Sequence, residues 1–98
     1  MSYYVYILRC ADDTLYTGIT NNVVRRVIIH NNGKGAKYTR SRRPVEVVYL
    51  EVCIDKPSAL QREREIKGMT RERKQHLIAE QNRATSEVQH YGDEGSNY

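Results

Sequence analysis

The sequence predicts one α+β domain, in which a small three-stranded antiparallel sheet is flanked by three helices. Two strand-like runs near the N-terminus are joined by a turn of only a few residues, and so short a connection requires antiparallel pairing. Three helix-like segments accompany the strands, and each must bury an apolar side against the sheet. The 98 residues leave room for a single hydrophobic core. The expected order is strand, strand, helix, strand, helix, helix.

The predicted strands are rich in tyrosine and β-branched residues and are bounded by turn-forming residues. An Ala-Asp-Asp turn separates the first two strands. Because side chains alternate along a strand, a three-residue loop there would set Tyr6 opposite Tyr16, although the sequence alone leaves the register open. The strands are expected at residues 2–9, 14–18 and 45–54.

Each predicted helix follows a residue whose side chain can accept a backbone N–H of the first turn. Thr20 or Asn21 is expected to cap the first helix, Asp55 the second and Thr70 the third. The first helix ends before an Asn-Gly stretch and the second before Gly68, because Asn and Gly accommodate the end of a helix. The helices are expected at about residues 21–31, 56–67 and 71–81.

The folded domain is expected to cover residues 1–82. Residues 83–98 are polar and without periodicity, which indicates a disordered C-terminal tail. No apolar run approaches the roughly 18 residues of a membrane span, and the N-terminus lacks the pattern of a secretory signal. Cys10 and Cys53 lie in apolar runs and are interpreted as buried, reduced thiols rather than as a disulfide or metal pair. A cytoplasmic protein without a membrane partner is expected.

Positive charge is concentrated in one part of the chain, although the net charge of +4 is modest. Residues 25–43 contain seven Lys or Arg and no Asp or Glu, and the segment after the first helix is expected to be a basic loop that leads to Pro44. A basic block of this length favours a polyanionic partner such as nucleic acid. The alternative is a solvated basic loop without a partner.

Three polar residues occupy unusual positions on the predicted helices. The apolar stripe of the first helix consists of Val23, Val24, Val27 and Ile28. Arg26 and His30 lie one turn apart at its border, a position that suits groups reaching the edge of a cleft and equally suits solvated residues. Glu63 falls in the middle of the second helix's apolar stripe, between Ala59 and Leu60. A carboxylate that faces the interior needs a cation, a metal or donor groups. An internal Arg or Tyr partner is the structural alternative to a metal-binding or catalytic role.

These residues stand in an order that resembles the GIY-YIG nuclease domain, and especially its small stand-alone bacterial members. Tyr4-Val5-Tyr6 corresponds to the first signature tripeptide and Tyr16-Thr17-Gly18 to the second. Arg26 and His30 match the family's Arg-x-x-x-His pattern, and Glu63 matches its acid. The likeness covers about residues 3–80, and its specificity comes from five matched elements in the correct order.

The resemblance implies a metal-dependent nuclease that hydrolyses phosphodiester bonds in DNA or RNA. By that resemblance Tyr6 is the first choice for the general base that activates water, and Tyr16 orients the water or takes that role itself. Arg26 would hold the phosphate, and His30 would relay a proton or bond the phosphate. Glu63 would be the only protein ligand of one Mg²⁺ or Mn²⁺.

The expected polymer is DNA in the first instance, with DNA repair as one setting. Two alternatives stay open. One is a non-cleaving nucleic-acid-binding module on the same fold, which Tyr4 in place of the family's glycine permits. The other is a protein-interaction domain with no polyanion partner. The residues expected to bind the nucleic-acid backbone are Lys34, Lys37, Arg40, Arg42 and Arg43.

Overall fold

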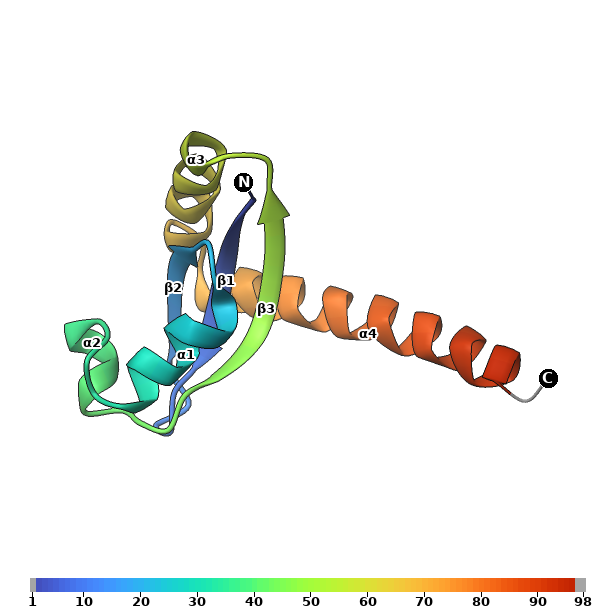
Figure 1. The fold of residues 1–98 in the computed structure, drawn as a ribbon, viewed down its shortest axis with the longest axis horizontal. Helices are drawn as coiled ribbons and strands as arrows, with labels where there is room; N and C mark the ends of the chain where they lie inside the picture. The colour runs from blue at the N-terminus through green and yellow to red at the C-terminus, as the bar shows by residue number, and fades with distance from the viewer. Residues whose placement is uncertain (1, 97–98) are drawn as a thin grey trace.

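The computed structural model describes residues 2–96, with side chains to residue 84. It confirms the α+β architecture and the three-stranded antiparallel sheet, whose strand order is β2-β1-β3. Figure 1 shows α1 and α2 gathered at one end of the sheet, while α4 leads away from it. The elements are β1 (Tyr3–Arg9), β2 (Leu15–Thr20), α1 (Val23–Asn31), α2 (Lys37–Arg40), β3 (Glu46–Cys53), α3 (Lys56–Lys67) and α4 (Arg71–Ser96).

The register of the hairpin differs from the one expected. Tyr6 pairs with Gly18 of β2, and Tyr16 pairs with Leu8 of β1, so the prediction that Tyr6 faces Tyr16 is wrong. The reason is the length of the connection, because the last ladder pair joins Arg9 to Leu15 and leaves residues 10–14 in the turn. A loop of this length shifts the ladder relative to a three-residue loop.

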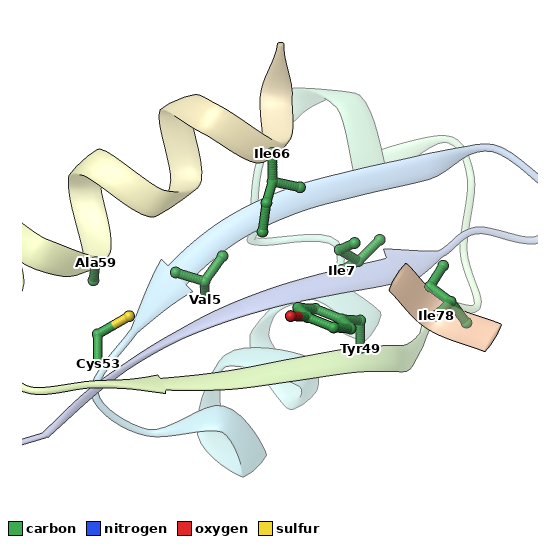
Figure 2. Packing of buried hydrophobic residues seen from close by; sticks show 7 residues of the cluster. All are labelled: Val5, Ile7, Tyr49, Cys53, Ala59, Ile66 and Ile78. Carbon is green, nitrogen blue, oxygen red and sulfur yellow. The ribbon is translucent and has the colours of Figure 1, made fainter. Parts of the chain in front are cut away.

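One face of the sheet packs against α3 and α4. Figure 2 shows side chains of β1 and β3 pointing toward α3, whose Ala59 and Ile66 lie over them. Burial of a large aliphatic side chain stabilises a fold by about 1.5–3 kcal/mol, so this layer contributes substantially to the stability of the domain. The buried members of the cluster are Val5, Ile7, Tyr49, Cys53, Ala59, Ile66 and Ile78.

The opposite face of the sheet carries a second cluster, which α1 covers. Tyr6 and Leu8 of the central strand are fully buried there, with Val27 of α1 packed against them. Cys10 and Val45 complete the buried part of this cluster. Because side chains of β1 alternate between the faces, Val5 and Ile7 belong to the α3 side while Tyr6 belongs to the α1 side.

The capping residues agree with the sequence at two helices and differ at one. Asp55 accepts a backbone N–H of α3 at 2.9 Å, and Thr70 accepts one of α4 at 3.2 Å, as predicted. The cap of α1 is Asn22, which accepts a backbone N–H at 3.1 Å. Neither Thr20 nor Asn21 has that role. Thr20 accepts the backbone N–H of Asn22 instead, and so fixes the entry of the chain into the helix.

Helix α4 is longer than the sequence indicates. It was expected to end near Gln81 but continues to Ser96 in the structure, and residues 97–98 lie outside the described residues. A helix that is already nucleated can propagate through a polar stretch that contains no proline. The division into a domain over 1–82 and a tail over 83–98 stays a prediction.

The side-chain amide of Gln81 attaches α4 to the edge strand β3. It donates to the carbonyl of Leu50 at 2.6 Å and accepts the backbone N–H of Leu50 at 3.0 Å. These two bonds occupy backbone groups on the open side of β3, which would otherwise be available to a strand of another chain.

The two cysteines agree with the sequence interpretation. Cys10 and Cys53 are both buried and carry free thiols. Within the described residues, no helix is long and apolar enough to cross a membrane.

Replacing Thr17 with Val is expected to stabilise the fold by about 1 kcal/mol. The Thr17 side chain is buried, and its hydroxyl has no hydrogen-bond partner among the described residues. A methyl group of similar size would remove the desolvation cost without leaving a cavity. Urea unfolding of both proteins measures the difference, and a lower unfolding free energy for Thr17→Val would show that the hydroxyl has a partner.

Candidate active site

The hydroxyl of Tyr6 lies over the neighbouring strand β2, at the position of Gly18. A Cβ atom added at Gly18 would stand 2.5 Å from the Tyr6 hydroxyl oxygen and 3.2 Å from the ring of Tyr16. Glycine is therefore required at this position by the close approach of two aromatic rings. This contact places the Tyr6 hydroxyl over β2, which is an edge strand of the sheet.

The imidazole of His30 is fully buried against these rings. Its Nε2 lies 3.0 Å from the Tyr6 hydroxyl oxygen, within hydrogen-bond distance. The ring meets Tyr6 and Tyr16 edge-on, with centroid separations of 6.0 Å and 5.5 Å. Such edge-to-face contacts are favourable between aromatic rings. His30 is thus held between the tyrosines of both signature tripeptides.

The burial of His30 corrects the orientation expected for α1. The predicted buried stripe includes Val24 and Ile28, but these side chains are 72% and 54% exposed, whereas His30, expected at the border, is 0% exposed. The helix is rotated so that Val27 and His30 face the sheet. The imidazole can be buried because both of its ring nitrogens have partners, and the apolar pattern does not contain that information.

Arg26, one turn before His30, also acts on Tyr6. Its guanidinium, a positively charged donor, acts to lower the pKa of Tyr6 because it favours the phenolate. Burial nevertheless raises the pKa of Tyr6 above its ordinary value, with smaller contributions from Tyr16 and from the negative charge of Glu63. Burial, together with the charge of Arg26, lowers the pKa of His30. At neutral pH both groups are therefore uncharged.

Glu63 lies on α3, which packs on the face of the sheet opposite α1. Its side chain is 18% exposed, and its carboxylate lies 3.3 Å from the Lys67 ammonium one turn further along α3. Its negative charge makes a small contribution to the raised pKa of Tyr6. The inward orientation of Glu63 agrees with the sequence analysis. Leu60, expected in the same stripe, is 39% exposed.

Glu63 is suited to a metal ion that takes few protein ligands. Among the described residues, no group of three or more His, Cys, Asp or Glu side chains lies together. A hard cation such as Mg²⁺ can bind through one carboxylate while water and phosphate oxygens complete its shell. The partly exposed carboxylate of Glu63, whose ion pair is with a half-exposed lysine, fits that requirement.

Helix α2 contacts Tyr16 and His30, and the sequence pattern does not predict this helix. The segment was expected to be a loop, but Lys37–Arg40 forms one turn of helix. Tyr38 stacks on Tyr16 with centroids 6.1 Å apart and planes 23° from parallel. The guanidinium of Arg42 lies 3.9 Å from the centre of the Tyr38 ring and donates to Asp12 at 2.9 Å. A single turn is too short to show periodicity, so no sequence signal marks it.

The five predicted backbone-binding residues fall into two groups. Arg42 and Arg43 are used within the fold, because Arg43 donates to the carbonyls of Arg40 at 2.8 Å and Asn31 at 3.3 Å. The remaining three side chains are exposed, and none has a partner within the part of the chain that the structure describes. They are Lys34, Lys37 and Arg40.

Replacing Gly18 with Ala is expected to destabilise the protein by about 1–3 kcal/mol, because the new methyl group must displace the buried Tyr6 ring. Gly68→Ala is the matched control, since a Cβ there makes only ordinary contacts of 3.6 Å. Urea unfolding reports the stability, and ultraviolet titration of tyrosine reports whether Tyr6 keeps its raised pKa. Equal stability of the two variants would contradict the close approach at Gly18.

Residues 2–76 match the family model described as the GIY-YIG catalytic domain. Among similar proteins, a UPF0213 protein of Natronomonas pharaonis is 56% identical over 79 residues, which cover 81% of this chain and 93% of the relative. A UPF0213 protein of Staphylococcus epidermidis is also 56% identical, over 78 residues that cover 80% of this chain and 95% of the relative. The similarity to this chain therefore covers nearly the whole length of both relatives.

Two solution NMR structures resemble the fold. A UPF0213 protein from Bacillus halodurans aligns with a TM-score of 0.53 and 44% identity, over 81% of this chain and 84% of that one. A protein from E. faecalis aligns with a TM-score of 0.59 and 37% identity, over 84% and 88%. The three-stranded sheet and its helices are therefore shared with experimentally determined relatives.

Proposed function

This chain belongs to the GIY-YIG family, and on that premise we propose that it is a metal-dependent nuclease that hydrolyses phosphodiester bonds in DNA. Nucleases of this family act on nucleic acids and generally use divalent metal ions. The observation that carries the proposal is the buried contact between the Tyr6 hydroxyl and His30, which also packs against Tyr16. The charges of Arg26 and Glu63 both affect the pKa of the same phenol.

The proposed reaction begins with proton transfer from water to Tyr6. The water oxygen forms a bond to phosphorus, the bond from phosphorus to the leaving sugar oxygen breaks, and that oxygen takes a proton from solvent. As Tyr6 accepts the proton of the water, its own proton passes to Nε2 of His30, 3.0 Å away. Because the transfer is coupled, Tyr6 need not ionise beforehand, which accommodates its raised pKa.

The other side chains position the reacting groups. Arg26 would hold a non-bridging phosphate oxygen, for which the fork of a guanidinium is well suited. Tyr16, packed against His30, would orient the water. Glu63 would hold one Mg²⁺ or Mn²⁺, which supplies stabilisation of the charge that develops on the phosphate and on the leaving oxygen.

Glu63→Gln is expected to lower the cleavage rate at least on the order of 100-fold while DNA binding is retained, because it removes the only carboxylate proposed as a ligand. Glu65→Gln is the matched control, since Glu65 lies on the same helix but is exposed and pairs with Arg62. Cleavage of single-stranded, duplex and branched DNA, and of RNA, is measured with Mg²⁺, with Mn²⁺ and with a chelator.

The second candidate is a non-cleaving nucleic-acid-binding module. It is favoured by Tyr4, which stands where the family signature has glycine, and by the exposed basic side chains near α2. If the wild-type protein and Glu63→Gln bind every substrate equally and neither cleaves any of them with either metal, the nuclease proposal is wrong and the binding module stands. The nuclease proposal includes a role in DNA repair and a cytoplasmic location.

Replacing Lys34, Lys37 and Arg40 together with Ala is expected to weaken DNA binding and to reduce the slope of log affinity against log salt by about 2 to 3. Each removed charge would otherwise displace one counterion from a phosphate. Binding is measured by fluorescence anisotropy across a range of salt concentrations.

The matched control removes three exposed positive charges elsewhere, at Lys56, Arg64 and Arg73. The overall charge of the two triple variants is then the same, so only the location differs. An equal loss of affinity in both would contradict a defined binding surface near α2. If the wild-type protein does not bind DNA at any salt concentration, the protein-interaction alternative is favoured.

A further inference from the structure

Thr39 of α2 and His30 of α1 form a buried hydrogen-bonded pair, and the proposed reaction assigns no role to Thr39. Thr39 and His30 are both 0% exposed. The Nδ1 atom of His30 lies 2.9 Å from Oγ1 of Thr39, and the same hydroxyl donates to the carbonyl of Ala36 at 2.9 Å. The second ring nitrogen, Nε2, is the atom that faces Tyr6.

The direction of these hydrogen bonds assigns the proton on the imidazole. A carbonyl oxygen can only accept, so the single hydroxyl hydrogen of Thr39 is directed at Ala36. The Thr39 oxygen must then accept from His30, which requires a proton on Nδ1. In a neutral imidazole Nε2 therefore carries no proton and can accept one from Tyr6.

We propose that Thr39 is a positioning residue that holds His30 in the tautomer protonated on Nδ1, so that Nε2 is available to take the Tyr6 proton during hydrolysis. This inference deepens the proposed function and depends on it for its catalytic part. The assignment of the tautomer itself depends only on the geometry. Fixing the tautomer of a histidine through its second nitrogen is a general way to prepare it for proton transfer.

The surroundings of the ring leave Nδ1 with one partner. A Cβ at Gly35 would stand 2.8 Å from Cγ of His30 and would also clash with Nδ1, so the backbone at Gly35 closes this edge of the imidazole. Thr39 is the only polar partner of Nδ1 among the described residues. The titratable groups around the ring are Tyr6 from β1, Tyr16 from β2 and Arg26 from α1. Burial and Arg26 lower the pKa of His30, which favours the neutral ring.

Nitrogen-15 NMR of His30 tests the assignment directly, in metal-free protein that keeps the wild-type residues at Thr39 and throughout the site. At neutral pH the expected spectrum shows a protonated Nδ1 and an unprotonated Nε2. His76 and His90 are removed by substitution to leave one labelled imidazole. A protonated Nε2 would overturn the proposal, whatever the cleavage assays show.

Two substitutions at Thr39 test the catalytic part. Thr39→Val keeps the shape but removes the hydroxyl, and it is expected to abolish the preference for protonated Nδ1 and to lower kcat by on the order of 10- to 100-fold with little change in KM. Thr39→Ser keeps the hydroxyl and is expected to retain the wild-type tautomer and most of the rate. Ser41→Ala, which removes an exposed hydroxyl just after α2, is the matched control.

The outcomes separate this inference from the proposed function. A wild-type protein that cleaves nothing overturns the nuclease proposal, while the NMR spectrum still supports or refutes the role of Thr39 in fixing the tautomer. If the wild-type protein cleaves DNA and folded Thr39→Val cleaves at the same rate, the positioning role is wrong. If Thr39→Val does not fold, the wild-type spectrum and the rate of Thr39→Ser decide the question.

Discussion

The approach of the Tyr6 phenol to Gly18 determines where the site can form. Tyr6 belongs to the central strand β1, and its ring lies across the edge strand β2 at Gly18, the one position where β2 has no side chain. There the hydroxyl contacts His30 of α1, and the charge of Glu63 on α3 affects its pKa, although these helices pack on opposite faces of the sheet. Residues far apart in the sequence can meet there because the hydroxyl lies at an edge of the sheet. A phenol over the middle of either face would reach only one helix layer.

Burial keeps both partners of the proposed proton transfer neutral. The pKa of Tyr6 is raised and that of His30 is lowered, so neither a phenolate nor an imidazolium is favoured before substrate arrives. Arg26 acts in the opposite sense on the pKa of Tyr6, because a positively charged donor favours the phenolate. A phosphate bound by Arg26 and a cation at Glu63 would change this balance. In the proposed reaction, proton transfer is therefore tied to the presence of substrate and metal.

The basic segment after α1 serves the fold as well as the proposed binding surface. Arg42 covers the Tyr38 ring and pairs with Asp12, and Arg43 bonds backbone carbonyls, so these cations are committed to structure. Tyr38 in turn stacks on Tyr16, which connects the segment to the signature tyrosines. A surface for nucleic acid built from the neighbouring lysines would lie directly beside the site. Binding and positioning would then share one short stretch of chain.

The sequence by itself predicted the three strands, helices α1 and α3, the start of α4, and the caps at Asp55 and Thr70. A common catalytic site of Tyr6, Tyr16, Arg26, His30 and Glu63 stays a prediction, which the contact between Tyr6 and His30 supports. These features follow from local periodicity, local hydrogen bonding and the order of the signature residues. Only the tertiary structure decided the hairpin register, the complete burial of His30 and the length of α4.

The contacts of α2 also came only from the tertiary structure. Thr39 contacts His30 and Tyr38 contacts Tyr16, because this single turn of helix packs against α1 beside the end of β2. Such contacts depend on the length of loops and on which buried polar groups find partners, and no periodic pattern in the chain encodes either quantity.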